Sequence, residues 1–233
     1  MSTTNPEIWS VAVCLYDRLT PLDFQGPVGL FGFLAPEVIA NKPEVLEQEG
    51  SSPFKSVPKV ALDLHYLSVS LDPVVTDSGP KLVPTDLYSA EKQYDVLLVP
   101  GGSNGNPQGV PKELLEFLKK QAPKAKYVLT VCTGSWILAA TGLLDGKRAT
   151  TNKFTFNMVK ETTSKSIEWV PKARWVVDGN YWTSSGVTAG ADMANAFLQH
   201  IVGEETAKQI RGIIELSSRE EGDDEFADFY GLV

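Results

Sequence analysis

Residues 127–140 have the sequence YVLTVCTGSWILAA. An apolar, β-favouring run ends at Cys132 and a helix-favouring run follows directly, so we expect a strand that turns sharply into a helix at this cysteine. The next residues, Thr133, Gly134 and Ser135, are small and leave room for the turn. A nucleophile elbow has this arrangement, and a helix N-terminus favours the thiolate form of a cysteine held there. The alternative on local sequence is a buried cysteine that serves as a small apolar side chain.

On either side of this stretch, apolar runs typical of strands alternate with amphipathic runs typical of helices. We expect strands at residues 8–16, 60–71, 81–84, 94–100, 126–131, 174–177 and 181–184. We expect helices at residues 28–34, from 111 onward, from the elbow to about 142, and at 153–160, 190–201 and 204–216. Residues 21–27 and 101–109 are expected to be loops, and residues 41–58 a loop or surface insertion. This alternation predicts a single α/β domain over residues 1–233 with a mostly parallel sheet.

Three chemically notable segments each follow an expected strand. Asp23 comes after the first strand, Gly101 and Gly102 after another, and Cys132 after the next along the chain. Ligands of such sheets bind beyond the carboxyl ends of the strands, so we expect these residues to converge on one pocket.

The composition is that of an ordinary globular protein with few special features. The chain has 233 residues, a net charge of −8 and two cysteines that form no Cys-x-x-Cys pair, which favours a reducing compartment such as the cytoplasm. No apolar run is long enough to span a membrane, no secretory signal is expected, and no lysine or arginine cluster suggests nucleic acid or a membrane as a partner. Metal-binding and nucleotide-binding motifs are absent from the sequence.

The C-terminal residues 206–233 are expected to form a helical, acidic extension. Residues 215–233 carry seven acidic side chains against the single basic residue Arg219. This segment is either solvated or packed through its aromatic residues Phe226, Phe229 and Tyr230, and a docking peptide is the alternative.

Several motifs together resemble the DJ-1/PfpI superfamily, and most closely its isonitrile hydratase-like branch. They are PLDFQGP at 21–27, VPGG at 99–102, VCTGS at 131–135, ATGLLDGKRATT at 140–151, DGN at 178–180 and TAGAD at 188–192, within a core of about residues 8–205. The resemblance implies a flavodoxin-like three-layer sandwich with helices on both faces of the sheet. It also implies a homodimer without metal or organic cofactor, acting on a small electrophilic molecule. Family regulators carry an added helix-turn-helix module, which we do not expect in the short acidic segment after residue 205.

The resemblance assigns Cys132 as the nucleophile, Asp23 as its acid–base partner and Thr133 as an active-site neighbour. Burial and a nearby thiolate would raise the pKa of Asp23 and keep it protonated, able to donate to sulfur and later to the substrate. The N–H groups of Gly101 and Gly102 are candidates to stabilise charge on the substrate. The structural alternatives are a turn or helix cap for Asp23, a tight turn for the glycines and a first helical residue for Thr133.

One position departs from the family pattern. Many members carry a histidine after the Ala-Thr-Thr stretch, where this chain has Asn152, and its only histidines are His65 and His200, outside the motifs. This disfavours a Cys–His dyad or an amidase triad. We take Asn152 as a substrate-binding candidate instead.

Three functions therefore remain as hypotheses. The first is a hydratase that converts an isonitrile to an N-substituted formamide through a thioimidate on Cys132, with Asp23 as general acid/base. The second is a cofactor-free glyoxalase that converts methylglyoxal through a hemithioacetal on the same sulfur. The third is a redox or stress-response protein in which Cys132 is oxidised.

Overall fold

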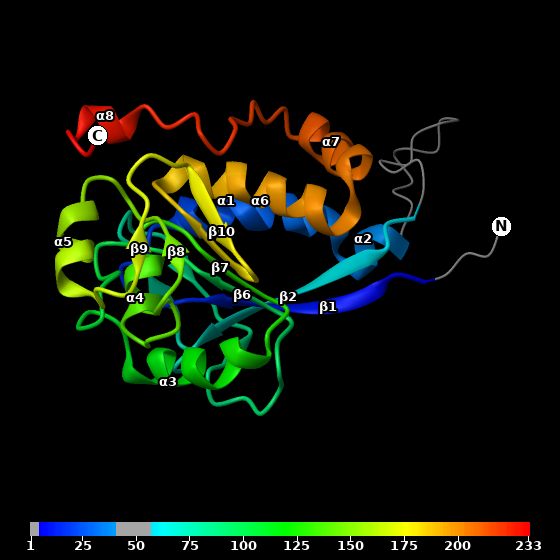
Figure 1. Ribbon diagram of the computed structural model, residues 1–233. Helices are drawn as coiled ribbons and strands as arrows, with labels where there is room; N and C mark the ends of the chain where they lie inside the picture. The colour runs from blue at the N-terminus through cyan, green and yellow to red at the C-terminus, as the bar shows by residue number, and fades with distance from the viewer. Residues whose placement is uncertain (1–4, 41–56) are drawn as a thin grey trace.

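The computed structural model describes residues 5–40 and 57–233, which build one central sheet covered by helices (Figure 1). Its seven strands lie in the order β10-β11-β7-β6-β1-β2-β5. They are β1 (Glu7–Cys14), β2 (Val60–Ser68), β5 (Asp86–Leu87), β6 (Val96–Val99), β7 (Tyr127–Thr130), β10 (Trp175–Asp178) and β11 (Tyr181–Ser184). Neighbouring strands are parallel except β10 and β11, which pair antiparallel across the turn at Gly179.

Two small ribbons flank this sheet. They consist of β3 (Val74–Val75) with β4 (Lys81–Leu82), and β8 (Arg148–Ala149) with β9 (Glu168–Trp169). The helices are α1 (Pro21–Phe31), α2 (Pro36–Ala40), α3 (Lys112–Gln121), α4 (Gly134–Ala139), α5 (Phe156–Thr162), α6 (Val187–Val202), α7 (Glu204–Ile213) and α8 (Phe226–Phe229). Short 3-10 turns follow α1 at Gly32–Leu34 and α3 at Ala122–Lys124.

Helices lie on both faces of the sheet, as predicted. α1 and α6 pack against each other on one face, while α3 and α4 lie together on the other (Figure 1). The central strands β1, β6 and β7 are buried on both sides, which explains why their sequences are continuous apolar runs. The expected α/β class, the mostly parallel sheet and the flavodoxin-like layering are confirmed.

The strand register brings the chemically notable segments together. Val99 at the end of β6 is opposite Thr130 of β7, and the Val131 N–H donates to the Val99 carbonyl at 3.0 Å. Gly101 therefore follows β6 at the same level as the elbow that follows β7. The loop before α1 reaches the same edge, where the Thr20 N–H donates to the Gly101 carbonyl at 2.9 Å.

Two sequence expectations about helices were wrong. Residues 21–27 form the first part of α1 instead of a loop, although Pro27 lies inside the helix and removes one backbone donor. Packing of α1 against α6 overrides this local signal, and a side chain at Gly26 would touch the Ala191 methyl at 3.4 Å. Residues 206–233 are helical only in part, because α7 ends at Ile213 and Glu215 adopts a left-handed backbone conformation with φ 53°.

Other boundaries differ by a few residues from the expected ones. The predicted helix at 153–160 begins at Phe156, and α6 begins at Val187, three residues before the expected start. The predicted insertion at 41–58 lies outside the described residues except at its last two positions.

The turn into α4 is packed too closely for any side chain at Gly134. A Cβ there would collide with the Val99 carbonyl oxygen on the neighbouring strand. We expect Gly134→Ala to lower the free energy of unfolding by about 3 kcal/mol or more, because backbone must move to make room. Urea unfolding of the purified protein measures the change.

Gly29 supplies the matched control, because it lies in α1 and no atom comes within 4 Å of a Cβ placed there. Gly29→Ala should leave the unfolding free energy unchanged or raise it by about 0.5–1 kcal/mol. Equal destabilisation by the two substitutions would contradict close packing at Gly134.

Candidate active site

Cys132 occupies a strained turn between β7 and α4. Its backbone φ is 57°, a left-handed value that is uncommon for a residue with a side chain. Three hydrogen bonds hold this conformation: the Cys132 N–H donates to Ser185 O at 2.8 Å, and its carbonyl accepts from Ser135 Oγ at 3.0 Å and Thr151 Oγ1 at 3.1 Å. The sharp strand-to-helix turn expected at Cys132 is therefore present.

Asp23 lies in the first turn of α1 and is fully buried. Its Oδ2 accepts a hydrogen bond from the Gly101 N–H at 2.9 Å, and its Oδ1 is buried without a partner. Asp23 and Cys132 are close enough for each to shift the pKa of the other. The orphaned Oδ1 is thus the oxygen available for proton exchange with sulfur or with a bound molecule.

Gly101 and Gly102 connect this carboxyl group to the elbow. A Cβ at Gly101 would lie 2.6 Å from the Thr133 nitrogen and 2.9 Å from Asp23 Oδ2, so only glycine fits. The Gly102 N–H donates to Thr133 Oγ1 at 3.2 Å. Both N–H groups therefore position Asp23 and Thr133. The sequence makes them candidates to stabilise charge on the substrate, but both are already occupied.

The electrostatics of the pair differ in one respect from the expectation. Burial raises the pKa of Asp23 from 3.8 to about 7, with the Gly101 hydrogen bond and Cys132 acting in the opposite direction. Burial also raises the pKa of the Cys132 thiol, and a negative charge on Asp23 raises it further. Hydrogen bonds from the Thr133 N–H and the Asn152 and Thr133 side chains oppose this without reversing it. The six-residue helix α4 does not make Cys132 a resting thiolate.

Asn152 stands beside the sulfur, on the loop between β8 and α5. Its Oδ1 accepts from the Phe154 N–H at 2.9 Å, so its Nδ2 is left to donate. A hydrogen bond between the Asn152 side chain and Cys132 lowers the pKa of the thiol. Asn152 is therefore a hydrogen-bond donor to the Cys132 sulfur, and this bond favours the thiolate form.

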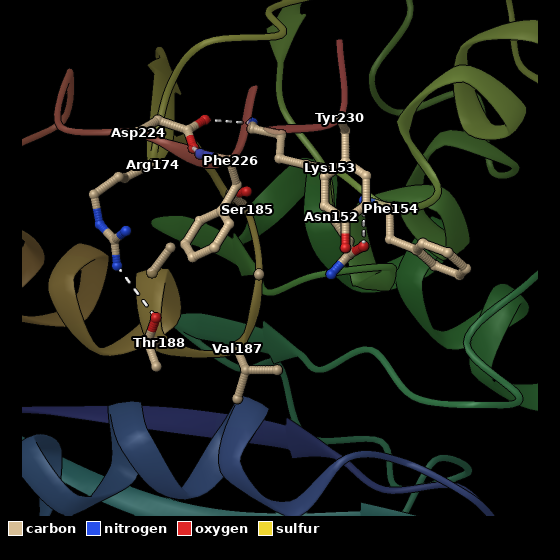
Figure 2. Close-up of a pocket in the computed structure, with 12 residues that line it drawn as sticks. Asn152, Lys153, Phe154, Arg174, Ser185, Val187, Thr188, Asp224, Phe226 and Tyr230 are labelled. Atoms are coloured by element: carbon tan, nitrogen blue, oxygen red, sulfur yellow. Dashed lines mark hydrogen bonds and ion pairs between the residues drawn. The ribbon is translucent and has the colours of Figure 1, made fainter. Parts of the chain in front are cut away.

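A pocket of about 210 Å³ lies beside Asn152 (Figure 2). Cys132 itself is 8% exposed and does not line the pocket. Asn152 and Ser185 do line it, and these two residues are direct hydrogen-bond partners of the Cys132 side chain and backbone. The Asn152 side chain therefore borders both the pocket and the Cys132 sulfur.

The pocket contains residues that sequence reasoning missed. These are Lys153, Phe154, Arg174, Thr188, Asp224, Phe226 and Tyr230. The last three come from the acidic C-terminal segment, whose aromatic residues were the only sequence signal that it packs against the domain. Both histidines are engaged elsewhere: His65 with Asp63 and Asp86, and His200 with Tyr127.

Residues 5–40 and 57–233 contain neither a metal-binding cluster nor a membrane-spanning helix. No group of three or more histidine, cysteine or acidic side chains in this part of the chain is arranged to hold a metal ion. No helix within it is long and apolar enough to cross a membrane.

Comparisons with known proteins agree with the resemblance drawn from the motifs. The model of the DJ-1/PfpI family matches residues 38–200. The isonitrile hydratase of Pseudomonas putida is 36% identical over 172 residues, which are 72% of this chain and 73% of that enzyme. The HTH-type transcriptional regulator GbdR of Pseudomonas aeruginosa is 30% identical over 150 residues, which are 64% of this chain and 39% of the regulator.

A solved structure extends the match to nearly the whole fold. A THiJ/PfpI family protein from Pseudomonas syringae superimposes with a TM-score of 0.70 and 25% identity, covering 92% of this chain and 77% of that one. Sequence motifs, sheet order and elbow geometry thus point the same way, and the chain belongs to the DJ-1/PfpI family.

Proposed function

We propose that this protein is a cofactor-free hydratase that converts an isonitrile, R–N≡C, to the N-substituted formamide. The observation that carries the proposal is the buried Asp23 carboxyl with its unpartnered Oδ1 beside the Cys132 thiol. The 36% identity to an isonitrile hydratase supports this chemistry in a family whose members also include regulators and deglycases.

The first step forms a carbon–sulfur bond. Asp23 takes the proton of the Cys132 thiol as sulfur attacks the terminal carbon of R–N≡C, and then passes that proton to the same carbon. The product is a thioimidate, Cys132–S–CH=N–R. Asn152 Nδ2 and the Thr133 N–H stabilise the negative charge that develops on sulfur during the transfer.

The second step regenerates the thiol. Water adds across the C=N bond, placing OH on carbon and H on nitrogen, with Asp23 relaying the proton. The C–S bond then breaks and the hydroxyl proton returns to sulfur through Asp23. The formamide R–NH–CHO leaves, and the enzyme is in its starting state. No redox change occurs, so the residues of this chain are sufficient for the cycle.

The homodimer, the cytoplasmic location and the absence of a cofactor are part of the same proposal. They rest on membership of the family and are independent of the site geometry. Size-exclusion chromatography with light scattering would test the dimer, because a monomeric mass at micromolar concentration contradicts it.

The first test is turnover of benzyl isonitrile and of methylglyoxal by purified protein. We expect N-benzylformamide from the wild type and none above the uncatalysed rate from Cys132→Ala, because this substitution removes the attacking thiol. Asp23→Asn should lower kcat/KM at least about a hundredfold, since it removes proton transfer. Chromatography with mass detection measures the product.

Cys14 provides the matched control, because it is a second buried cysteine in β1. Cys14→Ala should retain formamide production if it folds. Turnover of methylglyoxal without turnover of the isonitrile would contradict the hydratase and support the glyoxalase. Turnover of neither substrate would contradict both enzymatic functions.

The second test is the pH dependence of kcat/KM. Below about pH 7 both Asp23 and Cys132 carry a proton, and above it Asp23 is ionised while the thiol, whose pKa is raised above 9.0, keeps its proton. Only the ionised Asp23 can accept the thiol proton. We therefore measure kcat/KM from roughly pH 5.5 to 9. We expect it to rise through about pH 7 and to stay level at higher pH. A profile that falls through pH 7 would show that the doubly protonated pair is reactive.

The third test concerns Asn152. Replacing it by alanine removes a hydrogen bond to the developing thiolate, worth about 1.5–3 kcal/mol, so kcat/KM should fall roughly 10- to 150-fold. Alkylation of Cys132 by iodoacetamide should slow as well, because the pKa of the thiol rises. Unchanged alkylation in Asn152→Ala would refute direct donation to sulfur.

A further inference from the structure

The C-terminal segment closes the pocket beside Asn152, although it lies beyond the part of the chain that matches the family model. We call residues 218–230 the strap. After α7 the chain turns back, crosses over α6 and reaches the side of the molecule where α5 lies (Figure 1). The family model covers residues 38–200.

Backbone contacts fasten the strap at three levels. The Arg219 N–H donates to Asp192 Oδ1 at 3.1 Å, and the Glu221 carbonyl accepts from the Arg174 N–H at 2.7 Å. Further on, Asp224 Oδ2 accepts from the Ala173 N–H at 3.2 Å. These contacts join the strap to α6 and to the loop before β10. The acidic segment is therefore packed on the domain, as one of the sequence alternatives held.

A buried ion pair fixes the strap to the loop that carries Asn152. Lys153 Nζ lies 3.2 Å from Asp224 Oδ2, and both side chains are only 2% exposed. Lys153 also donates to Thr150 Oγ1 at 2.8 Å and to the Ala173 carbonyl at 2.9 Å, so its three donors are satisfied. Breaking one half of such a pair leaves an uncompensated buried charge, so the strap is held firmly in this position.

The strap presents two aromatic rings to the pocket. Phe226 and Tyr230 line it, and both remain about half exposed at 45% and 42%. Tyr230 meets Phe154 edge to face, with ring centroids 6.0 Å apart. Figure 2 shows these side chains reaching toward the pocket that Asn152 borders. The arrangement provides apolar surface with free area for a ligand to cover.

The charged side chains that line the pocket are already paired. Lys153 pairs with Asp224, and the Nε and Nη2 of Arg174 both donate to Oδ2 of Asp192, which lies outside the pocket lining. Neither cation is left to recognise a carboxylate or phosphate. The volume of about 210 Å³ is also smaller than the roughly 300–1,000 Å³ of sites for drug-sized ligands.

We infer that the strap forms a specificity wall, in which Phe226 and Tyr230 bind a neutral, apolar substituent the size of one ring. This inference rests on the proposed function for the identity of the reacting group. The substituent lies in the pocket, and the linear isonitrile group extends past Asn152 to the Cys132 sulfur. A small substrate gains nothing from the wall, so the wall selects among isonitriles by size.

The test compares benzyl isonitrile with methyl isonitrile in Phe226→Ala and Tyr230→Ala. The ratio of kcat/KM for the benzyl over the methyl substrate should fall about tenfold in each variant, because only the larger substituent contacts the ring. Phe226→Leu keeps an apolar side chain, should keep most of the ratio, and serves if the alanine variant fails to fold.

Phe229 is the matched control for Phe226, because it lies in the strap, is 75% exposed and does not line the pocket, and its ring packs against Tyr230 with centroids 4.9 Å apart. Phe229→Ala should leave the ratio within about twofold of the wild type. An unchanged ratio in Phe226→Ala, or an equal loss in Phe229→Ala, would overturn the inference.

A binding experiment separates this inference from the proposed function. Calorimetry of N-benzylformamide with Cys132→Ala measures occupancy of the pocket without any reaction. We expect binding that Phe226→Ala, made in the same background, weakens about tenfold, while Phe229→Ala does not. If the wild type turns over no isonitrile but the variants bind N-benzylformamide as expected, the proposed hydratase reaction is wrong and the specificity wall is supported. If N-benzylformamide does not bind, the wall is wrong even for an active hydratase.

Discussion

The close approach of Gly101 to Asp23 and Thr133 is the constraint on which the site depends. A Cβ at Gly101 would fall 2.6 Å from the Thr133 nitrogen, so the absence of a side chain there lets the β6 loop, the first turn of α1 and the elbow meet. The Gly101 N–H then binds Asp23 Oδ2 and leaves Oδ1 without a partner. Parallel register between β6 and β7 brings Gly101 to this level. The carboxyl group is therefore positioned by backbone, which cannot rearrange as a side-chain partner can.

Burial governs the chemistry of the pair more than the helix does. Asp23 is fully buried and Cys132 is 8% exposed, so both resist ionisation and their pKa values rise together. A pair of this kind retains at least one proton at neutral pH and can pass it between sulfur and carboxyl. Chemistry that begins with thiol addition and needs a proton delivered to the same substrate suits this arrangement. A nucleophile that must be a thiolate at rest does not.

Much of the fold could be predicted because its signals are local. The run that ends at Cys132 shows both the strand and the helix of the elbow, and the alternation of apolar and amphipathic segments predicts the parallel sheet. The loop predicted at 21–27 was wrong, since proline and glycine in PLDFQGP indicate a turn while packing of α1 on α6 makes a helix. The pKa of Cys132 was misjudged because burial depends on neighbours distant in sequence.

The strap was beyond prediction for a similar physical reason. A run of acidic residues predicts a solvated segment. The contact that holds the strap joins Asp224 to Lys153, which lie far apart in the chain and are both almost fully buried. Asn152 could be identified as a candidate site residue by position, but its role as a donor to sulfur depends on the Phe154 N–H occupying its Oδ1. Residues whose function depends on such partners carry no signature of their own.

The central claim is that Cys132 forms a covalent bond to the isonitrile carbon with Asp23 exchanging the proton. Rapid mixing with excess benzyl isonitrile, acid quenching and intact-mass spectrometry test it directly. We predict a transient species heavier than the free protein by the mass of one isonitrile molecule, located on the peptide containing Cys132 and slower to form in Asp23→Asn. Formamide production without any such adduct in wild type, or the same adduct mass on Cys132→Ala, would contradict the claim.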